Sequence, residues 1–275
     1  MRWTPFAPLA LALALVPPAA SGDEPARRAG ALVIVGGGGM PDAVRDRFVA
    51  LGGGKGVARI VVIPTASAAA DDRAEEAGFL DPWRRHEPAS LALLHTRSRA
   101  RADDPEFARA IDAATAVWFS GGDQNKLTAA YLDTATHRAI RALLARGGVV
   151  GGTSAGAAVM TEVMIEGGDP QARVGRGLGL LPGAVVDQHF LRRSRFDRLL
   201  GVVAARPGLV GLGIDEATAL VVEGDRWGVV GRSYVVACRA GRDGRPPHIV
   251  ALGEGDAGTF AADGFPAPAP ARRPD

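Results

Sequence analysis

The chain has 275 residues, of which 47% are hydrophobic and 23% charged, and its formal net charge is +2. This composition argues against a disordered or fibrous protein. The small basic excess argues against a nucleic-acid-binding protein, which needs a concentrated basic face. The single cysteine, Cys238, cannot form an internal disulfide or a paired zinc or redox motif. We expect one catalytic-sized α/β domain, because such units often reach about 250 residues.

The N-terminus has the order of a secretory signal. Arg2 precedes an apolar run over residues 6–16, and prolines and small residues follow it. We expect residues 1–22 to be a signal peptide, so that the mature chain is exported to the periplasm or the medium. The apolar run is shorter than the roughly 20 residues of a membrane span, and no cysteine follows it for lipid attachment. An uncleaved anchor is the alternative.

Short apolar blocks alternate with amphipathic stretches from residue 31 onward, which is typical of parallel strands joined by crossover helices. The predicted strands, each expected to be buried on both faces, are residues 31–35, 59–64, 91–94, 116–119, 148–150 and 184–187. The predicted helices are residues 42–51, 105–114, 137–146, 155–164 and 192–205. We therefore predict an α/β fold, a three-layer α/β/α sandwich around a mostly parallel sheet.

From residue 210 onward the alternation of strands and helices gives way to closely spaced strands. Close-set strands are predicted over residues 210–214, 219–223, 227–230 and 233–238, with glycine-containing turns between them. They predict a C-terminal β-meander that closes a catalytic domain over residues 30–253. Residues 254–275 are rich in Pro and Ala and are predicted to be a flexible tail.

A glycine-rich loop covers residues 36–39, directly after the first predicted strand. It lacks the GxGxxG spacing of dinucleotide-binding proteins, because Pro41 stands where the third glycine should be. It also lacks the Lys-Ser/Thr end of a P-loop. We interpret it as a tight turn before a helix, and we expect no cofactor.

The most specific motif is GGTSAGA over residues 151–157, which contains GxSxG between a predicted strand and a predicted helix. Small residues on both sides of a serine allow the sharp turn of a nucleophile elbow, which exposes the hydroxyl in a strained conformation. Ser154 is therefore the predicted nucleophile. The helix that follows directs backbone N–H groups at the site, so the Ala155 N–H can stabilise an oxyanion.

A serine hydroxyl needs a base to remove its proton and an acid to orient that base. Among five histidines we favour His189, which ends a predicted strand on the same edge as the elbow, while His95 is not excluded. Asp215 and Glu216 both follow the strand over residues 210–214, and alternation directs them to opposite sides. The spacing alone does not decide between these two acids.

The order of partners along the chain separates two folds. An α/β-hydrolase runs serine, acid, histidine, which would require His248 as the base. His248 lies next to proline, and the chain has no HGGG-like oxyanion loop, so this fold ranks second.

Four motifs in order carry a family resemblance. They are FSGGDQ (119–124), GGTSAGAAVM (151–160), DQHF (187–190) followed by Arg193, Arg195 and Arg198, and GIDEATAL (213–220). Over about residues 31–252 the chain resembles the cyanophycinase branch of the cyanophycinase and peptidase E family of serine peptidases. The resemblance implies a class I glutamine amidotransferase-like fold and a Ser–His–Glu triad, which falls on Ser154, His189 and Glu216.

The resemblance also implies roles for neighbouring loops. Gly122 would supply a second oxyanion N–H, and Gln124 would contact the substrate; an ordinary helix-capping turn is the alternative. Arg193 and Arg195 would bind a substrate carboxylate, since guanidinium groups pair with carboxylates in a bidentate manner; a solvated basic helix face is the alternative. Asp187 and Gln188 could hold substrate groups, although capping of the strand end is equally plausible.

The function that these expectations predict is an exported serine exopeptidase. Cyanophycinases release β-aspartyl-arginine dipeptides from a polyaspartate polymer, and the resemblance implies this substrate class. Glu166 or Asp169 could provide the carboxylate that recognises arginine, although the 35 residues from Ser154 to His189 are few for a cyanophycinase. A peptidase E-like or isoaspartyl dipeptidase and a non-catalytic binding domain are the rival functions.

The expected partner is a peptide or cyanophycin-like polymer. Neither nucleic acid nor a stable membrane span is expected, and a homodimer is left open by the sequence. No metal-ligand spacing is present, and the proposed chemistry requires no metal.

Overall fold

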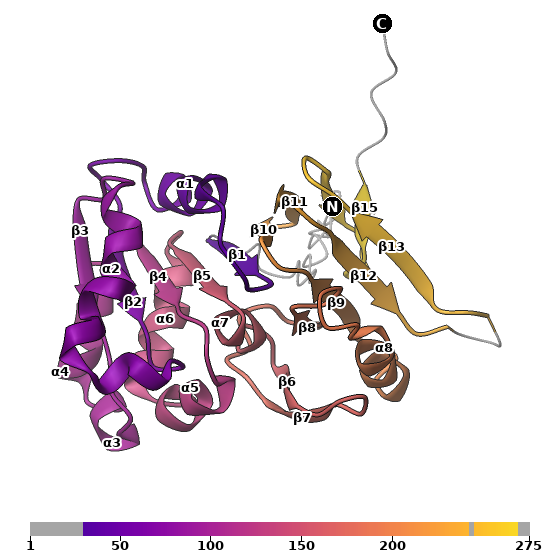
Figure 1. Cartoon of the computed structure of the whole chain (residues 1–275), viewed down its shortest axis with the longest axis horizontal. Helices are drawn as coiled ribbons and strands as arrows, with labels where there is room; N and C mark the ends of the chain where they lie inside the picture. The colour runs from indigo at the N-terminus through magenta and orange to yellow at the C-terminus, as the bar shows by residue number, and fades with distance from the viewer. Residues whose placement is uncertain (1–29, 242–244, 269–275) are drawn as a thin grey trace, which may run out of the picture.

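The computed structural model describes residues 30–241 and 245–268 (Figure 1). The predicted signal peptide, residues 1–22, lies outside the described residues. Within the described part of the chain, no helix is both long enough and apolar enough to span a bilayer.

A nine-stranded sheet forms the centre of the fold. In spatial order its strands are β15 (Pro266–Pro268), β14 (Ala257–Phe260), β11 (Arg226–Gly231), β10 (Thr218–Glu223), β1 (Ala31–Val35), β5 (Val149–Thr153), β4 (Ala116–Phe119), β2 (Arg59–Ile63) and β3 (Ser90–Leu93). The half from β1 to β3 is parallel, and the half from β1 to β15 is antiparallel. The inner parallel strands are unbroken apolar runs, as expected of strands covered on both faces, and the α/β class is confirmed.

Helices cover both faces of the parallel half. They are α1 (Asp42–Leu51), α2 (Glu76–Arg84), α3 (Arg99–Ala102), α4 (Pro105–Ala108), α5 (Gln124–Tyr131), α6 (Ala135–Ala145) and α7 (Ala155–Ala158), with 3-10 turns η1 (Ala68–Asp71), η2 (Arg73–Glu75) and η3 (Arg109–Ile111). The remaining helix, α8 (Phe196–Ala205), packs on a second sheet. Alternation along the strands divides the core between the two faces. Val33 faces the layer of α1 and α2, whereas Ile34 faces the layer of α5, α6 and α7.

The layer of α1 and α2 is fixed by three aromatic rings. Phe48 of α1, Trp83 of α2 and Trp118 of β4 pack with ring centroids 4.8–5.2 Å apart, at tilted or edge-on angles. Such geometries are favoured over face-to-face stacking. They pack both helices against the middle strand of the parallel half of the sheet.

A second sheet has four strands in the order β13 (His248–Leu252), β12 (Val235–Arg239), β9 (Val210–Ile214) and β8 (Ala184–Gln188). Its inner side chains, such as Val186 and Leu212, join the main core. Its outer side chains pack against α8. The predicted C-terminal strands are therefore present but do not form one meander, because β9 and β12 belong to this second sheet while β10 and β11 extend the first (Figure 1).

The predicted tail over residues 254–275 is corrected in its first part. β14 pairs with β11, and β15 pairs with β14. The Trp227 indole N–H donates to the Thr259 carbonyl at 3.0 Å, and Phe265 is buried under the Arg239 guanidinium. Two buried aromatic rings therefore stabilise a segment whose Gly, Ala and Pro content suggested none.

Three of the predicted helices are shorter than expected. The helix predicted over residues 105–114 ends at Ala108 and is followed by a 3-10 turn that ends at Ile111. The helix after the elbow ends at Ala158 rather than at residue 164, and β6 (Val163–Gly167) follows and pairs with β7 (Arg173–Arg176). The helix expected from residue 192 begins at Phe196. The strand near residue 91 is an edge strand with alternating exposure, not a strand buried on both faces.

Candidate active site

Ser154 lies on a sharp turn between β5 and α7, where its backbone has φ 54° and ψ −109°. Its N–H donates to the Val35 carbonyl at 3.0 Å. A Cβ on Gly152 would lie 2.5 Å from the Gly156 carbonyl oxygen, and a Cβ on Gly156 would lie 2.4 Å from the Phe119 carbonyl oxygen. Both glycines of GxSxG are therefore required by close backbone approach, and they allow the strained turn that presents the hydroxyl.

His189 and Glu216 complete a line of hydrogen bonds from that hydroxyl. Ser154 Oγ lies 2.9 Å from His189 Nε2, and His189 Nδ1 lies 2.6 Å from Glu216 Oε1. The residues come from three strand ends, since β8 and β9 run parallel side by side and β5 ends beside β1. The structure thus brings together the three predicted residues in the order hydroxyl, imidazole, carboxylate, and their catalytic roles stay a prediction.

The loop over residues 36–39 joins the two sheets at this point. Its Gly36 carbonyl accepts the His189 N–H, and its Gly37 carbonyl accepts the Ala217 N–H at 2.9 Å. A Cβ on Gly37 would lie 2.4 Å from the imidazole of His189, and a Cβ on Gly38 would lie 2.9 Å from the Glu216 side chain. The glycines therefore let the loop pack on the imidazole and the carboxylate, a role that the sequence interpretation as a simple tight turn missed.

The electrostatic surroundings lower the pKa of His189 from its ordinary value. Burial is the largest cause, and the charges of Arg193 and Arg195 add to it, while the hydrogen bond to Glu216 opposes it. A lowered pKa keeps the imidazole neutral at pH 7, which is the state that can accept a proton from Ser154.

The alternative partners lie elsewhere. Asp215 accepts hydrogen bonds from the Arg192 N–H at 2.9 Å and the Ser233 hydroxyl at 2.7 Å, which together lower its pKa although burial opposes them. His95 bonds to Thr65 and Asp71 instead of Ser154. His248 lies on β13 and packs against Phe265. The α/β-hydrolase alternative therefore has no base at the elbow.

The two predicted oxyanion groups belong to segments that lie next to Ser154. The Ala155 N–H is at the N-terminus of α7. On the facing loop, a Cβ on Gly121 would be 3.5 Å from Ser154 Cβ, and Gly122 follows with φ 138°. In the described part of the chain, no turn or cap hydrogen bond uses either the Gly122 or the Ala155 N–H.

Gln124 has a structural role that the sequence did not predict. Its amide nitrogen donates to the Ile165 carbonyl at 2.9 Å and to the Glu166 carbonyl at 2.8 Å. The side chain is buried and ties α5 to β6. Only its oxygen is left for the predicted substrate contact.

Asp187 is almost fully buried and forms a bidentate ion pair with Arg198, whose Nε lies 2.8 Å from Asp187 Oδ2. Burial raises the pKa of Asp187, and the bond with Arg198 opposes the rise. Arg198 also donates to the Gly168 carbonyl at 2.8 Å. The predicted substrate contact of Asp187 is therefore corrected, because its carboxylate is used to fix α8 and the β6–β7 turn.

The charges of Arg193 and Arg195 act on His189, and Gln188 precedes it in the chain. Arg195 Nη1 donates to the Gln188 carbonyl at 2.7 Å and to its side-chain oxygen at 3.1 Å, and lies 3.5 Å from Asp187 Oδ1. Arg195 is the residue preceding α8 and is half-buried, whereas Arg193 is exposed. Arg193 is therefore the better placed of the two to meet a substrate carboxylate.

The two carboxylates considered for arginine recognition lie on the β6–β7 hairpin. The Glu166 side chain lies across Gly175, because a Cβ there would be 1.9 Å from Glu166 Oε1. Asp169 is exposed and lies close enough to Arg195 for its negative charge to act on that guanidinium, whose pKa is lowered by burial and by Arg198 while Asp187 and Asp169 oppose the shift. Both remain candidates for contact with a cationic substrate.

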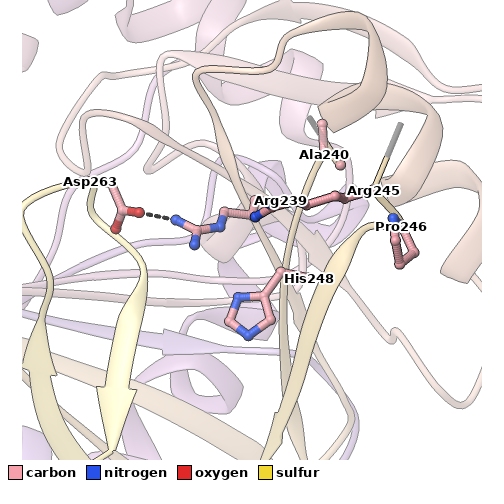
Figure 2. Close-up of a pocket in the computed structure, with 7 residues that line it drawn as sticks. Arg239, Ala240, Arg245, Pro246, His248 and Asp263 are labelled. Atoms are coloured by element: carbon pink, nitrogen blue, oxygen red, sulfur yellow. Dashed lines mark hydrogen bonds and ion pairs between the residues drawn. The ribbon is translucent and has the colours of Figure 1, made fainter. Parts of the chain in front are cut away.

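Among residues 30–241 and 245–268, no three His, Cys, Asp or Glu side chains gather as metal ligands would. A separate cavity of about 340 Å³ lies at the end of β12 and shares no residue with the triad. In it the Arg239 guanidinium is paired with the Asp263 carboxylate, next to the His248 ring (Figure 2). That ion pair offsets the charge of Arg239, and Arg245 also lines the cavity.

The chain is similar to known peptidases over most of its described length. The model of peptidase family S51 matches residues 32–230. The chain belongs to this family. It is 40% identical over 146 residues to a cyanophycinase of Trichormus variabilis, covering 50% of this chain and 49% of that protein.

Two further relatives extend the match. The chain is 36% identical over 201 residues to a cyanophycinase of Synechococcus elongatus, covering 68% of this chain and 62% of that protein. A crystal structure of a peptidase from an acI-B1 Actinobacterium has a TM-score of 0.66 and 27% identity, covering 84% of this chain and 97% of that one. The match spans about half the length of the Trichormus relative.

Proposed function

We propose that this S51 family member is an exported serine exopeptidase of the cyanophycinase type. The observation that carries the proposal is a partly exposed Ser154 at a strained turn whose Oγ lies 2.9 Å from His189 Nε2, with His189 Nδ1 2.6 Å from Glu216 Oε1. The cyanophycinases among its relatives support the substrate class. Export rests on the N-terminal pattern alone.

The proposed reaction begins when Ser154 attacks a peptide carbonyl beside an aspartyl residue and its proton passes to His189 Nε2. Glu216 accepts the Nδ1–H bond and stabilises the imidazolium. The N–H groups of Gly122 and Ala155 stabilise the oxyanion. His189 then protonates the leaving amine, and an ester on Ser154 remains. Water, deprotonated by His189, hydrolyses the ester and frees the serine.

The substrate is proposed to approach over the basic entrance beside His189. Arg193 would bind its free carboxylate, because it is exposed and its charge already acts on the imidazole. Asp169 or Glu166 on the β6–β7 hairpin would face the arginine side chain. This arrangement suits a zwitterionic β-aspartyl-arginine unit.

The test is to incubate the purified mature chain with insoluble cyanophycin and, separately, with β-aspartyl dipeptides, and to identify the products by mass spectrometry. Release of β-aspartyl-arginine from the polymer is the expected result. Cleavage of dipeptides alone would make the chain a dipeptidase, and no cleavage of either substrate would favour a binding domain. The Ser154→Ala protein is the control for a contaminating peptidase.

Export and assembly have separate tests. The mass of the protein recovered after secretion should correspond to loss of about the first 22 residues; a mass that begins at Met1 would contradict export. Light scattering of the mature chain distinguishes a monomer from the homodimer that the sequence leaves open.

A further inference from the structure

A hydroxyl, an imidazole and a carboxylate lie in line a second time, next to the loop that carries Gly122. Thr65 Oγ1 lies 2.8 Å from His95 Nδ1, and His95 Nε2 lies 2.9 Å from Asp71 Oδ1. The Tyr131 hydroxyl lies 2.7 Å from Thr65 Oγ1 and accepts the Thr96 N–H at 3.2 Å. Thr65 and Tyr131 are fully buried. These hydrogen bonds join the segments that follow β2 and β3 to the C-terminal end of α5.

One tautomer of His95 gives every hydrogen-bond donor in this side-chain network an acceptor. The Tyr131 O–H donates to Thr65 Oγ1, the Thr65 O–H donates to His95 Nδ1, and the Nε2–H donates to Asp71. With a proton on Nδ1, the Thr65 O–H would have to turn toward Tyr131. The buried Tyr131 hydrogen would then lose its acceptor, which is costly. The network therefore specifies the Nε2–H form.

Arg97 connects this network to the backbone of the same turn. Its Nε donates to Asp71 Oδ2 at 2.9 Å, while Nη1 donates to the Thr65 carbonyl at 2.5 Å and Nη2 to the Ser67 carbonyl at 2.9 Å. These two carbonyls flank Ala66. A planar guanidinium held on three acceptors fixes the peptide between them.

The Ala66 peptide in turn supports the Gly122 loop. The Ala66 carbonyl accepts the Asp123 N–H at 2.9 Å, and a Cβ on Gly122 would lie 2.1 Å from the same oxygen. Helix α5 begins just after this loop and ends at Tyr131. Both ends of α5 are thus attached to one turn, by Asp123 at Ala66 and by Tyr131 at Thr65.

We propose that Arg97 and the Thr65–His95–Asp71 chain are positioning residues that hold the Gly122 N–H where the oxyanion forms. The proposal rests on the function proposed above, because it assigns Gly122 to the oxyanion. None of these side chains touches the reacting atoms. Their effect is on the transition state rather than on substrate binding, since the oxyanion exists only after attack.

Asp71 and Arg97, the two charged residues of the network, are accessible to solvent and therefore to small solutes. The hydrogen bonds from His95 and Arg97 lower the pKa of Asp71, which keeps it ionised as their acceptor. The Arg97 side chain is 32% exposed, whereas Thr65 is fully buried. Arg97→Ala therefore removes the guanidinium group and its three hydrogen bonds, and it leaves a site that a small guanidinium compound can enter from solvent.

The experiment compares Arg97→Ala with Arg101→Ala in the purified full chain. Arg101 also pairs with an aspartate, Asp104, but contacts neither the turn nor the Gly122 loop, so it controls for loss of a surface ion pair. Arg97→Ala should lower kcat about 10- to 100-fold, as expected from a displaced oxyanion donor, with KM within about twofold of wild type. Millimolar ethylguanidinium should restore part of the kcat of Arg97→Ala and leave that of Arg101→Ala unchanged.

A second measurement is independent of activity. Amide hydrogen exchange in the peptide that covers residues 120–124 should accelerate in Arg97→Ala and not in Arg101→Ala. Wild-type kcat in Arg97→Ala, a loss explained by a reduced folded fraction, or absence of rescue would overturn the proposal. If the wild-type chain hydrolyses no aspartyl substrate, the proposed function fails by itself, and unchanged exchange in residues 120–124 would then overturn the positioning role as well.

Discussion

Two hydrogen-bonded triads of hydroxyl, imidazole and carboxylate in this molecule have similar hydrogen-bond distances but different surroundings. Ser154–His189–Glu216 has distances of 2.9 and 2.6 Å, and Thr65–His95–Asp71 has distances of 2.8 and 2.9 Å. The carboxylate is on Nδ1 of His189 but on Nε2 of His95. Linear hydrogen bonding between three such groups is therefore not enough to identify a nucleophile.

What differs is the position of the hydroxyl. Thr65 is fully buried and already accepts a bond from Tyr131, so no carbonyl substrate can reach it. Ser154 is partly exposed at a strained turn, with a helix N-terminus on one side and a glycine loop on the other. Access and nearby oxyanion donors distinguish the triad that we propose to be catalytic from the one that we propose to support it.

The largest expected difference between the two triads is in the hydroxyls. Ser154→Ala should lower kcat/KM at least about ten-thousand-fold with unchanged folding. Thr65→Val should lower kcat only about tenfold and cost about 1–3 kcal/mol in the free energy of unfolding, because it leaves buried partners unsatisfied. Peptidase assays and urea unfolding measure both effects; a Thr65→Val protein as inactive as Ser154→Ala while fully folded would contradict the comparison.

The carboxylates should differ next. Glu216→Gln should lower kcat by roughly 100- to 10,000-fold, because an amide does not stabilise the imidazolium and can favour the wrong tautomer. Asp71→Asn should lower kcat about tenfold or less, since it acts only through the Gly122 loop. Steady-state kinetics with circular dichroism as the folding control decide the matter. Equal losses in the two variants would remove the distinction.

The loop that packs on the imidazole gives a third, smaller effect. Gly37→Ala places a methyl group 2.4 Å from the His189 ring, so the ring must move. We expect kcat to fall about 100-fold, as for misplacement of a catalytic group by an ångström. Gly54→Ala is the matched control for backbone strain, because Gly54 also has a positive φ, of 90°, and a Cβ there meets nothing within 4 Å. If both variants keep wild-type kcat, the loop does not position His189.

The smallest expected effect is in the pH profile. Because the pKa of His189 is lowered chiefly by burial, the imidazole loses its proton below the ordinary value of 6.5. The acid limb of kcat/KM should therefore lie below pH 6.5, with activity rising as pH rises through it. Arg193→Gln removes a nearby positive charge and should move this limb to higher pH. A limb that stays fixed or moves to lower pH would contradict the role of Arg193.

Short apolar runs were sufficient to predict the strands of the parallel half of the sheet, and an amphipathic stretch predicted the bounds of α1, because both patterns are local signals. The division of the C-terminal strands between two sheets was not predictable, since β9 and β10 read alike in sequence and differ only in partners. The tail was wrongly predicted because Trp227 and Phe265 stabilise it through contacts distant in sequence.

In the site, GxSxG and strand ends indicated Ser154 and His189, but spacing could not choose between Asp215 and Glu216. The family resemblance pointed to Glu216, and the structure bonds Glu216 to His189 while Asp215 accepts bonds from Arg192 and Ser233. Asp187 was predicted to contact substrate. Its ion-pair partner, Arg198, lies in the first turn of α8, and no local sequence pattern indicates that these two residues pair. Gln124 was likewise assigned by motif, whereas long-range bonds to β6 decide its role.

The central claim is that His189 makes Ser154, and not another hydroxyl, nucleophilic. It is tested most directly by treating the native chain with a phosphonofluoridate, which phosphonylates an activated serine with loss of fluoride, and mapping the adduct by peptide mass spectrometry. We predict one adduct, on Ser154, that is absent from the His189→Ala protein. An adduct on any other residue, or equal labelling of Ser154 without His189, would contradict the account.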